Sequence, residues 1–440
     1  MALHLQLLCV SWASMRTPHF LVIPVLSLAA ACSSDPVGST PLRADAAPPI
    51  EVDAAPSVDA SPDAGAPLEG DIERFAVTDG LLPKVTVVDT AQGIVGSFDV
   101  SGVGAVYGGA SGKYAYVAQG AQNVVHVVDM GIDEEDHGAH SHFYRRSPKL
   151  MATPITGTLP IHVVGHDGHV AAFFDDDGSA QLLDERDLDQ GKVSFLTIST
   201  GMPHHGFAVP FSGKVLATRP ELAPGSTRAV PNGLDVHSRI GAKEMAIAEG
   251  CPIAHGEAAK ANVAVVGCAD GALVVVPENG SFTGKKIANP AGLVGRVGTV
   301  VEHPSVRVFL ANYGADKLAL IDAAALTMTV FDAPAGGVIQ FAFADDGRIL
   351  VLTRDGKIHR LAADGSPGES LLVTSPATDD ANHGAKFPGF APALGGLLIT
   401  DPPKGQVHRV TTNPLRIQRS FAVPGSPTKI ASSVFEKHEH

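Results

Sequence analysis

Residues 104–129, GAVYGGASGKYAYVAQGAQNVVHVVD, decide the fold of this chain. The stretch holds a short segment of small apolar residues, a glycine-containing turn, a second segment rich in Tyr and Val, another turn, and a Val-rich segment ending in Asp129. Short β-branched and aromatic segments between glycine-containing turns are typical of antiparallel strands. The stretch therefore predicts three neighbouring strands of one small sheet.

The same pattern recurs along the chain with a period of roughly 40 to 50 residues, which is the spacing of propeller blades. Six further copies occupy residues 162–185, 207–220, 257–278, 300–324, 341–365 and 390–412. The repeat predicts an all-β fold, a β-propeller.

The two ends of the repeat region complete each other. Residues 74–100 lack a clear first strand, whereas residues 426–434 look like a first strand with nothing after it. Pairing these segments would close the ring and add a blade, and a closed ring has no exposed sheet edge. We therefore expect eight blades, closed by the N- and C-terminal strands, with seven blades as the alternative.

Composition excludes some classes of function. The chain has 440 residues, a formal net charge of −14, and 47 Gly and 32 Pro residues. The acidic balance argues against a nucleic-acid partner, because phosphate binding requires clustered Lys and Arg. The one Trp, Trp12, lies in the leader, so a stacking platform for bases is disfavoured.

The first 32 residues have the pattern of an export signal. Arg16 precedes an apolar segment and a run of small residues that ends at Cys32, and Met15 is a plausible start of translation. A cysteine after small residues resembles the lipobox of bacterial lipoproteins, although Ala29 stands where Leu is usual. We expect lipidation at Cys32 and a membrane anchor. The alternative is an ordinary cleaved signal peptide.

Residues 33–72 are rich in Ala, Pro, Asp and Ser, with few large apolar side chains. Such a segment buries too little apolar surface to offset chain entropy, so it is expected to be a disordered tether. The folded domain is expected to span residues 73–440. The protein would then be exported, either as a lipoprotein facing the periplasm or on the cell surface, and we expect a monomer.

Cys251 and Cys268 are the only cysteines in the folded domain. In an exported protein such a pair is expected to form a disulfide. Two thiolate metal ligands are the alternative.

Histidines precede or begin the first strand of three consecutive blades. The segments TLPIHVV, GMPHHGFAV and CPIAHGEAA deliver His162, His204 with His205, and His255 to one rim of the propeller. Loops between second and third strands open on the same face, and one of them holds Asp401.

Three imidazoles and one carboxylate suit a tetrahedral Zn²⁺ site. The predicted ligands therefore come from these five residues, of which His204 and His205 belong to the same blade. Glu257 is expected to orient a ligand through a hydrogen bond. Each histidine taken alone also has a simpler interpretation, as an ordinary polar residue at a strand end.

Residues 133–142, DEEDHGAHSH, join acids to histidines in a loop between a third and a fourth strand. Asp136, His137, His140 and His142 are candidates for a second, flexible zinc site, since acids attract cations and imidazoles bind them. A solvated acidic loop is the alternative. By strand alternation, the loop lies on the face opposite the histidine rim.

The ordered motifs HVVGHDGHVAAFFDDDGSA, PHHGFAVP, CPIAHGEA, GCADGALVV and LITDP resemble those of the AztD-type zinc metallochaperones, over most of the chain from about Val87 onward. The resemblance implies a β-propeller outside the cytoplasm that holds Zn²⁺ and passes it to the solute-binding protein of a zinc ABC importer. It also implies a ligand role for His205, His255 and Asp401. The expected lipid anchor and long tether differ from what a freely diffusing periplasmic carrier would have.

Two other classes of function remain open on the sequence. One is a propeller hydrolase or lactonase with a metal on the axis, in which Glu257 would act as base. The motifs H-E-x-x-H and G-x-S-x-G are absent from the sequence, and the histidine-rich rim disfavours Ca²⁺. The other is an interaction scaffold at the cell surface that binds no metal.

Overall fold

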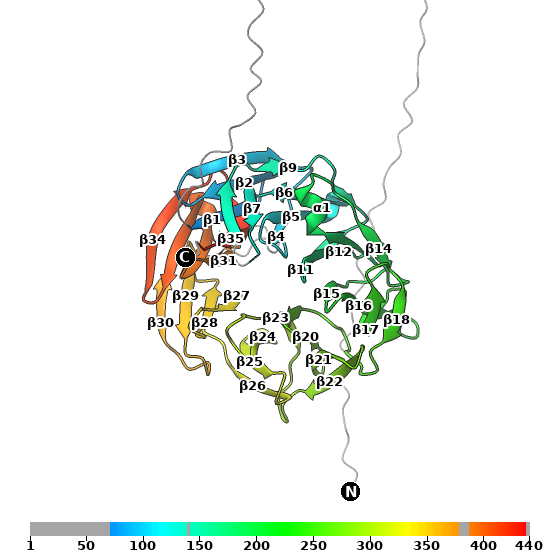
Figure 1. Cartoon of the computed structure of the whole chain (residues 1–440). Helices are drawn as coiled ribbons and strands as arrows, with labels where there is room; N and C mark the ends of the chain where they lie inside the picture. The colour runs from blue at the N-terminus through cyan, green and yellow to red at the C-terminus, as the bar shows by residue number, and fades with distance from the viewer. Residues whose placement is uncertain (1–70, 139–140, 378–386, 437–440) are drawn as a thin grey trace, which may run out of the picture. The chain divides into compact units, whose positions relative to one another are not determined.

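Eight antiparallel sheets surround one axis in residues 71–138, 141–377 and 387–436, the part of the chain that the computed structural model describes (Figure 1). Each sheet is one blade, and its strands run from the axis outward in hydrogen-bonded order. The predicted eight-bladed β-propeller is confirmed, and the seven-bladed alternative is wrong.

Six of the blades follow the chain without interruption. Blades 3 and 4 contain, from the inside outward, β11 (Pro160–His166), β12 (His169–Phe174), β13 (Ser179–Asp184) and β14 (Leu196–Ser199), then β15 (Ala208–Phe211), β16 (Lys214–Glu221), β17 (Val230–Ser238) and β18 (Lys243–Ala246). Blades 5 and 6 contain β19 (Glu257–Lys260), β20 (Val263–Cys268), β21 (Gly271–Glu278) and β22 (Ser281–Ala288), then β23 (Val297–Val301), β24 (Phe309–Tyr313), β25 (Lys317–Asp322) and β26 (Thr327–Asp332). Blades 7 and 8 contain β27 (Val338–Phe343), β28 (Ile349–Thr353), β29 (Lys357–Leu361) and β30 (Glu369–Leu372), then β31 (Phe390–Ala393), β32 (Gly396–Asp401), β33 (Gln406–Thr412) and β34 (Leu415–Ala422).

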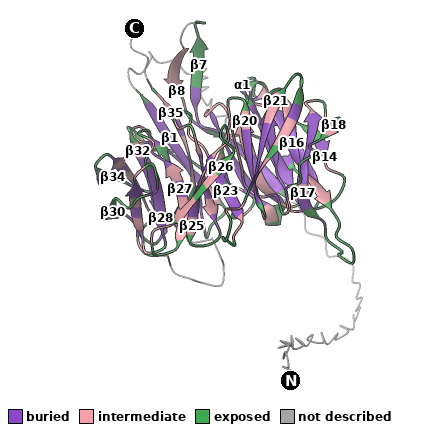
Figure 2. Ribbon diagram, turned by 90° about the horizontal axis from the view of Figure 1, so that it is seen from below, coloured by how far each residue is buried: buried purple, intermediate pink, exposed green. Residues whose placement is uncertain are grey.

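Blade 2 carries an insertion. Its strands are β4 (Ala105–Gly108), β5 (Tyr114–Gln119), β6 (Val124–Asp129) and an outer edge split into β9 (Lys149–Leu150) and β10 (Ile155–Thr156). Between β6 and β9 the chain forms a separate hairpin, β7 (Ile132–Asp136) with β8 (Ser141–Arg145), which stands out from one face of the ring (Figure 2). The helices of the described part of the chain are short: α1 (Glu185–Asp189) and two 3-10 turns, η1 (Gly120–Gln122) and η2 (Pro402–Lys404).

Blade 1 closes the ring with strands from both ends of the chain. The C-terminal β35 (Pro427–Phe435) is innermost, followed by β1 (Ile72–Asp79), β2 (Lys84–Asp89) and β3 (Gly93–Asp99). The pairing of β35 with β1 extends from Ile72 opposite Phe435 to Asp79 opposite Pro427. The C-terminal segment thus supplies the missing first strand, as the sequence predicted.

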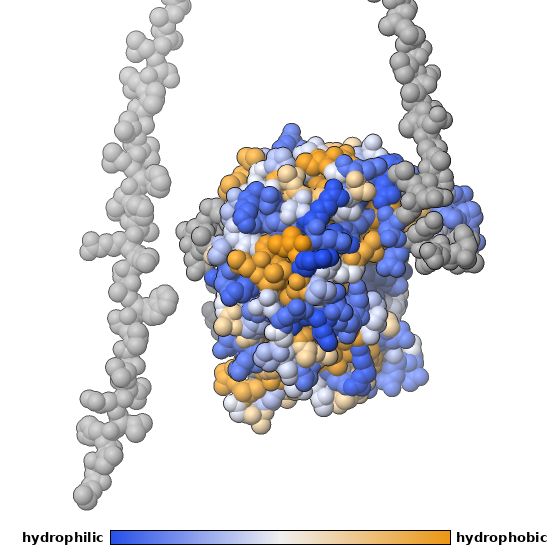
Figure 3. Space-filling model, turned by 90° about the vertical axis from the view of Figure 1, so that its left-hand side faces the viewer, coloured by the Kyte–Doolittle hydropathy of each residue, from blue (hydrophilic) through white to orange (hydrophobic). Residues whose placement is uncertain are grey.

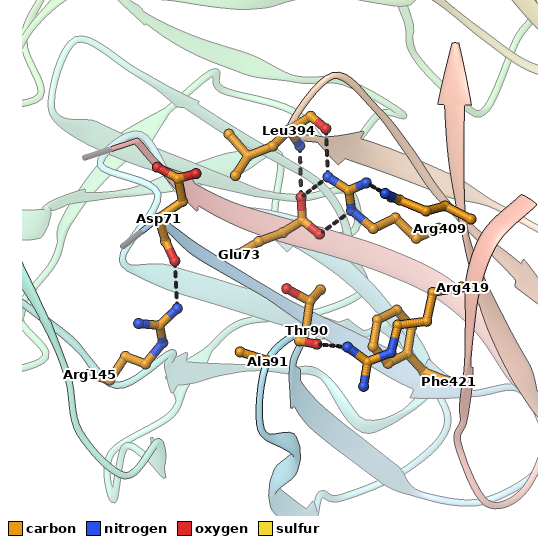
Figure 4. A pocket seen from close by; sticks show the side chains of 10 residues that line it. Asp71, Glu73, Thr90, Ala91, Arg145, Leu394, Arg409, Arg419 and Phe421 are labelled. Atoms are coloured by element: carbon orange, nitrogen blue, oxygen red, sulfur yellow. Dashed lines mark hydrogen bonds and ion pairs between the residues drawn. The ribbon is translucent and has the colours of Figure 1, made fainter. Parts of the chain in front are cut away.

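Polar contacts reinforce the seam between blade 8 and blade 1. A pocket of about 400 Å³ lies there (Figure 4). In it Glu73 of β1 accepts hydrogen bonds from Arg409 Nε of β33, at 2.9 Å, and from the backbone N–H of Leu394, at 2.7 Å. Arg419 of β34 lies over the ring of Phe421 and donates a hydrogen bond to the carbonyl of Thr90.

The core lies between neighbouring blades rather than at one centre. Every residue of β5 and of β12 is buried, because the second strand of a blade is covered on both faces. Val209 and Leu216 of blade 4, for example, share one apolar cluster with Val266 of blade 5. Figure 2 shows buried strands inside the blades, and on the side of the ring in Figure 3 hydrophilic and apolar side chains are mixed.

Strand alternation defines two faces of the ring. We call the entry face the one on which the chain enters each innermost strand; loops between second and third strands open on it too. The opposite face receives the connection between third and fourth strands, and the hairpin β7–β8 is inserted in such a connection. Within the described ranges, no helix has the length and apolarity needed to cross a bilayer.

Candidate metal-binding site

Three imidazoles meet on the entry face of the ring. A ring nitrogen of each of His162, His205 and His255 lies within 4.8 Å of the others, and all three residues are half-buried. The ring centroids form a near-equilateral triangle, with sides of 5.0, 5.3 and 5.5 Å. The Nε2 atoms of His162 and His205 are 3.4 Å apart. Zn–N distances of about 2.0–2.1 Å in a tetrahedral site separate two ligand nitrogens by roughly this amount.

The blade repeat explains why these residues converge. His162 lies near the start of β11, whereas His205 and His255 lie in the loops just before β15 and β19. These are the innermost strands of blades 3, 4 and 5, so one structural position on three neighbouring blades delivers the three side chains.

Asp175 fixes the orientation of His205. It follows β12, is 97% buried, and its Oδ2 accepts a hydrogen bond from His205 Nδ1 at 2.6 Å. The donor role of Nδ1 leaves Nε2 of His205 as the nitrogen that faces the cluster. A carboxylate behind a metal-binding imidazole sets the tautomer and strengthens the ligand.

Burial favours the neutral form of two imidazoles of the cluster. Desolvation, with smaller contributions from the neighbouring His205 and His255, lowers the pKa of His162 to about 4 against an opposing effect of Asp175. Burial also lowers the pKa of His255, with added contributions from His205 and Arg296. Neutral imidazoles are the form that binds metal ions, so at neutral pH the protons of His162 and His255 do not compete with a cation.

A glycine follows both loop histidines because the backbone is crowded there. Gly256 has a φ of +72°, and a Cβ on it would lie 1.8 Å from the carbonyl oxygen of Gly298. A Cβ on Gly206 would lie 2.3 Å from Thr218 Oγ1. The glycines in the PHHG and AHGE motifs therefore let the loops pack closely enough for the histidines to meet.

The loop that carries His255 is held at several points. Cys251 and Cys268 form a disulfide that joins the loop to the end of β20. The N–H of His255 donates a hydrogen bond to the carbonyl of Gly267 at 3.0 Å, and the N–H of Gly267 donates to that of Gly256 at 2.9 Å. The position of His255 is thus fixed against a central strand of blade 5. Because the two cysteines are joined, they do not act as thiolate ligands.

Two predicted ligands lie outside the cluster. His204 is fully buried, with Nδ1 donating to the carbonyl of Met202 at 2.9 Å and Nε2 2.8 Å from Thr218 Oγ1. Its ring packs against Thr218 of blade 4 instead of facing the cluster. Asp401 is fully buried at the end of β32, with Oδ2 2.9 Å from Lys404 Nζ and 3.5 Å from His408 Nε2. Neither residue contributes an atom to the three-histidine group.

Glu257 makes no hydrogen bond to an imidazole of the cluster among the described residues, whereas Asp175 makes one to His205. Burial raises the pKa of Glu257 to about 8, and its Oε2 has no hydrogen-bond partner among the described residues. Asp175 was missed in the sequence, although it occupies the same kind of loop as Asp401, between a second and a third strand. The motif FFDDDG, which ends β12 and begins this loop, was the available signal.

The predicted flexible site lies in the hairpin β7–β8. The rings of His137 and His142 are 5.0 Å apart, centroid to centroid, and Asp136 Oδ1 accepts a hydrogen bond from the N–H of Gly138. Several acids of the hairpin are engaged in ion pairs or hydrogen bonds, for example Asp133 with Arg146 and Glu135 with Tyr144. His140 and the predicted lipidation site Cys32 lie outside the described residues.

The fold and the site define a class of protein: an eight-bladed propeller with three imidazoles on one face. Comparison of the sequence with characterised proteins agrees with the resemblance noted above. The chain is 27% identical over 369 residues to the zinc chaperone AztD of Citrobacter koseri, covering 82% of this chain and 86% of AztD. No protein-family profile matches the chain. The matched relative is a chaperone, in agreement with a function that is not enzymatic.

Solved structures give the same result. The crystal structure of Citrobacter koseri AztD superposes with a TM-score of 0.76 at 26% identity, covering 84% of this chain and all of that one. The apo form of AztD gives a TM-score of 0.75 at 25% identity, with the same coverage. The dihydro-heme d1 dehydrogenase NirN, at 12% identity and a TM-score of 0.55, shares the fold alone. The resemblance to AztD-type proteins is therefore confirmed.

Proposed function

We propose that this protein is a zinc metallochaperone that works outside the cytoplasm, holding Zn²⁺ at His162, His205 and His255. The observation that carries the proposal is the triangle of three imidazoles, one of them oriented by a buried carboxylate. Three protein ligands leave one tetrahedral position for water or for a ligand of another protein. The similarity to AztD supports zinc as the cargo.

The proposed recipient is the solute-binding protein of a zinc ABC importer. A site with an open coordination position suits transfer, because an incoming ligand can bind the metal before the first imidazole leaves. The disulfide supports an oxidising compartment. An export signal with a lipid anchor at Cys32 would hold the chaperone at the membrane that contains the importer.

Metal analysis tests the zinc site. The purified protein is loaded with Zn²⁺, desalted and analysed, alongside the variant His205→Ala/His255→Ala and the control His303→Ala/His359→Ala, which alters histidines outside the cluster. We expect about one zinc ion per chain in the wild type and in the control, and none in the cluster variant. A wild type that retains no zinc contradicts the proposal.

We also propose that Asp136, His137, His140 and His142 form a second, weaker zinc site that takes part in zinc exchange. The paired rings of His137 and His142 support this role. Deleting residues 133–142 should slow transfer to the recipient while leaving the zinc content of the three-histidine site intact. An unchanged transfer rate would remove the hairpin from the pathway.

A second candidate function is zinc-dependent hydrolysis of esters or lactones. The raised pKa of Glu257 favours it, since strongly shifted carboxyl groups near a metal site often serve as acids or bases. A panel of ester and lactone substrates, assayed with and without Zn²⁺, distinguishes the two functions.

A further inference from the structure

We infer that the entry face around the three histidines is the surface on which the zinc-accepting protein docks. This inference rests on the proposed function and adds to it where the partner binds. It begins with the distribution of exposed apolar side chains. Nine of the sixteen large ones in the described ranges lie in entry-face loops or at a first strand residue there, against four on the opposite face by the same criterion.

Six of the nine form an arc around the histidines, on blades 3 to 6. We call this set the apolar arc: Met202, Leu222, Val230, Ile253, Leu293 and Val294. Monomeric proteins rarely gather exposed apolar side chains in one place unless the patch serves as an interface.

Backbone contacts make the arc continuous with the metal site. Val230 begins β17 and pairs with Glu221, the residue before Leu222. The next residue, Pro231, accepts a hydrogen bond from the N–H of Ala254 at 3.1 Å. Ala254 lies between Ile253 and the ligand His255, so the middle of the arc is next to the cluster.

The flanks of the arc reach the other sides of the cluster. Met202 is three residues before His205, and its carbonyl accepts the hydrogen bond that holds the neighbouring His204. Val294 is fully exposed and lies two residues before Arg296, whose charge acts on His255. Exposed apolar side chains thus lie on several sides of the three imidazoles.

The chemistry of transfer selects the occupant. A recipient must bring its own ligand atoms to about 2 Å from the ion, so it has to dock directly over the histidines. The side chain of His205 is 42% exposed, which leaves the cluster open from this face. The fitting partner is a folded, zinc-binding protein with apolar side chains around its own metal opening, since interface cores are apolar and poor in charge.

A matched pair of variants tests the inference. The arc variant is Ile253→Asn/Val294→Ser, and the control is Leu326→Asn/Ile240→Ser on the opposite face. Ile253 and Leu326 both have a positive φ, +51° and +54°, which Asn tolerates, and all four residues are exposed. Neither variant alters a histidine of the cluster.

The full, zinc-loaded chain is mixed with the apo form of the solute-binding protein of a zinc ABC importer from the same organism. In a parallel experiment, a small chromophoric chelator extracts the zinc from the same zinc-loaded chain. We expect the arc variant to transfer zinc to the protein about ten-fold more slowly than wild type, because an interface loses about that factor per hot-spot contact. Extraction by the chelator, which needs no docking, should be unchanged in both variants.

The outcomes separate this inference from the proposed function. A wild type that never transfers zinc to the protein overturns the proposed function and the inference with it. Transfer by the wild type with equal rates in the arc and control variants overturns the inference alone. Sedimentation that shows a wild-type dimer lost in the arc variant would assign the arc to a second copy of this chain. If the wild type floats with phosphatidylglycerol vesicles and the arc variant does not, the arc is assigned to a membrane. Either result overturns docking of the acceptor on the arc.

Discussion

The hydrogen bond between Asp175 and His205 is the residue-scale feature on which zinc affinity should depend most. Asp175→Asn keeps the size of the side chain but removes the charge that strengthens the imidazole as a ligand. We expect the zinc affinity to fall by roughly 10- to 100-fold. Competition with a chelator of known affinity measures it. Asp176→Asn, one residue away and exposed, is the control, and an equal effect of the two substitutions would contradict the role of Asp175.

Another buried histidine predicts how stability depends on pH. His237 of β17 is 1% exposed, and neither ring nitrogen has a hydrogen-bond partner among the described residues. Burial lowers its pKa, and Lys243 lowers it slightly further. The Gly241 backbone, Asp235 and Glu244 have smaller, opposite effects. The unfolded chain therefore binds the proton more readily below about pH 6.5, so the free energy of unfolding should decrease as pH falls through that range.

His237→Leu removes this dependence. Relative to the variant, the wild type should lose up to about 1.4 kcal/mol of unfolding free energy per pH unit below pH 6.5, until the folded histidine itself protonates. Urea denaturation of both proteins between pH 7.5 and pH 5 measures the difference. Parallel curves for the two proteins would show that His237 is not buried in its neutral form.

At the scale of the element, the loop from Cys251 to Gly256 depends on its disulfide for its position. Removing the bond in Cys251→Ala/Cys268→Ala frees the unfolded chain, and for a separation of 17 residues this costs about 3 kcal/mol. Zinc affinity should fall as well, since His255 lies on the released loop. Denaturation with and without zinc measures both effects. A variant that loses stability but keeps its affinity would show that the backbone hydrogen bonds alone hold His255.

The elements also show what sequence reasoning can reach. The period of the strands predicted the blades, and the position before each innermost strand predicted the face on which His162, His205 and His255 lie. The period could not separate His204 from His205, because side-chain direction in a loop follows from local packing against Thr218. The rule for loops between second and third strands placed Asp401 at the correct height.

The rule did not place Asp401 at the correct angle around the ring. Blade 8 is not a neighbour of blade 4, whereas Asp175 occupies the equivalent loop of blade 3 and lies next to His205. Height along the axis follows from the strand pattern alone. Contact between side chains also depends on which blades are adjacent, and blade 8 lies across the ring from blade 4.

At the scale of the whole molecule, closure by β35 makes the ends of the ring neighbours. Ile72 pairs with Phe435, so a short glycine-rich linker can join them, as in a β-hairpin. New ends placed between Ala324 and Ala325, in an exposed loop of the face opposite the histidines, break no strand. This circular permutant contains the same strands, the same seam contacts of Glu73 with Arg409, and the same three imidazoles.

We expect the permutant to fold and to retain about one zinc ion per chain, because blades pack on their neighbours irrespective of where the chain begins. Its thermal midpoint with and without zinc, measured by calorimetry, is compared with that of the wild type and of a chain ending at Ser426, which lacks β35. The truncated chain exposes the inner edge of β1 and should aggregate or melt at a lower temperature. If the truncated chain instead matches the wild type, closure by β35 does not stabilise the ring. If the permutant alone fails, the order of strand synthesis, rather than the closed architecture, determines folding.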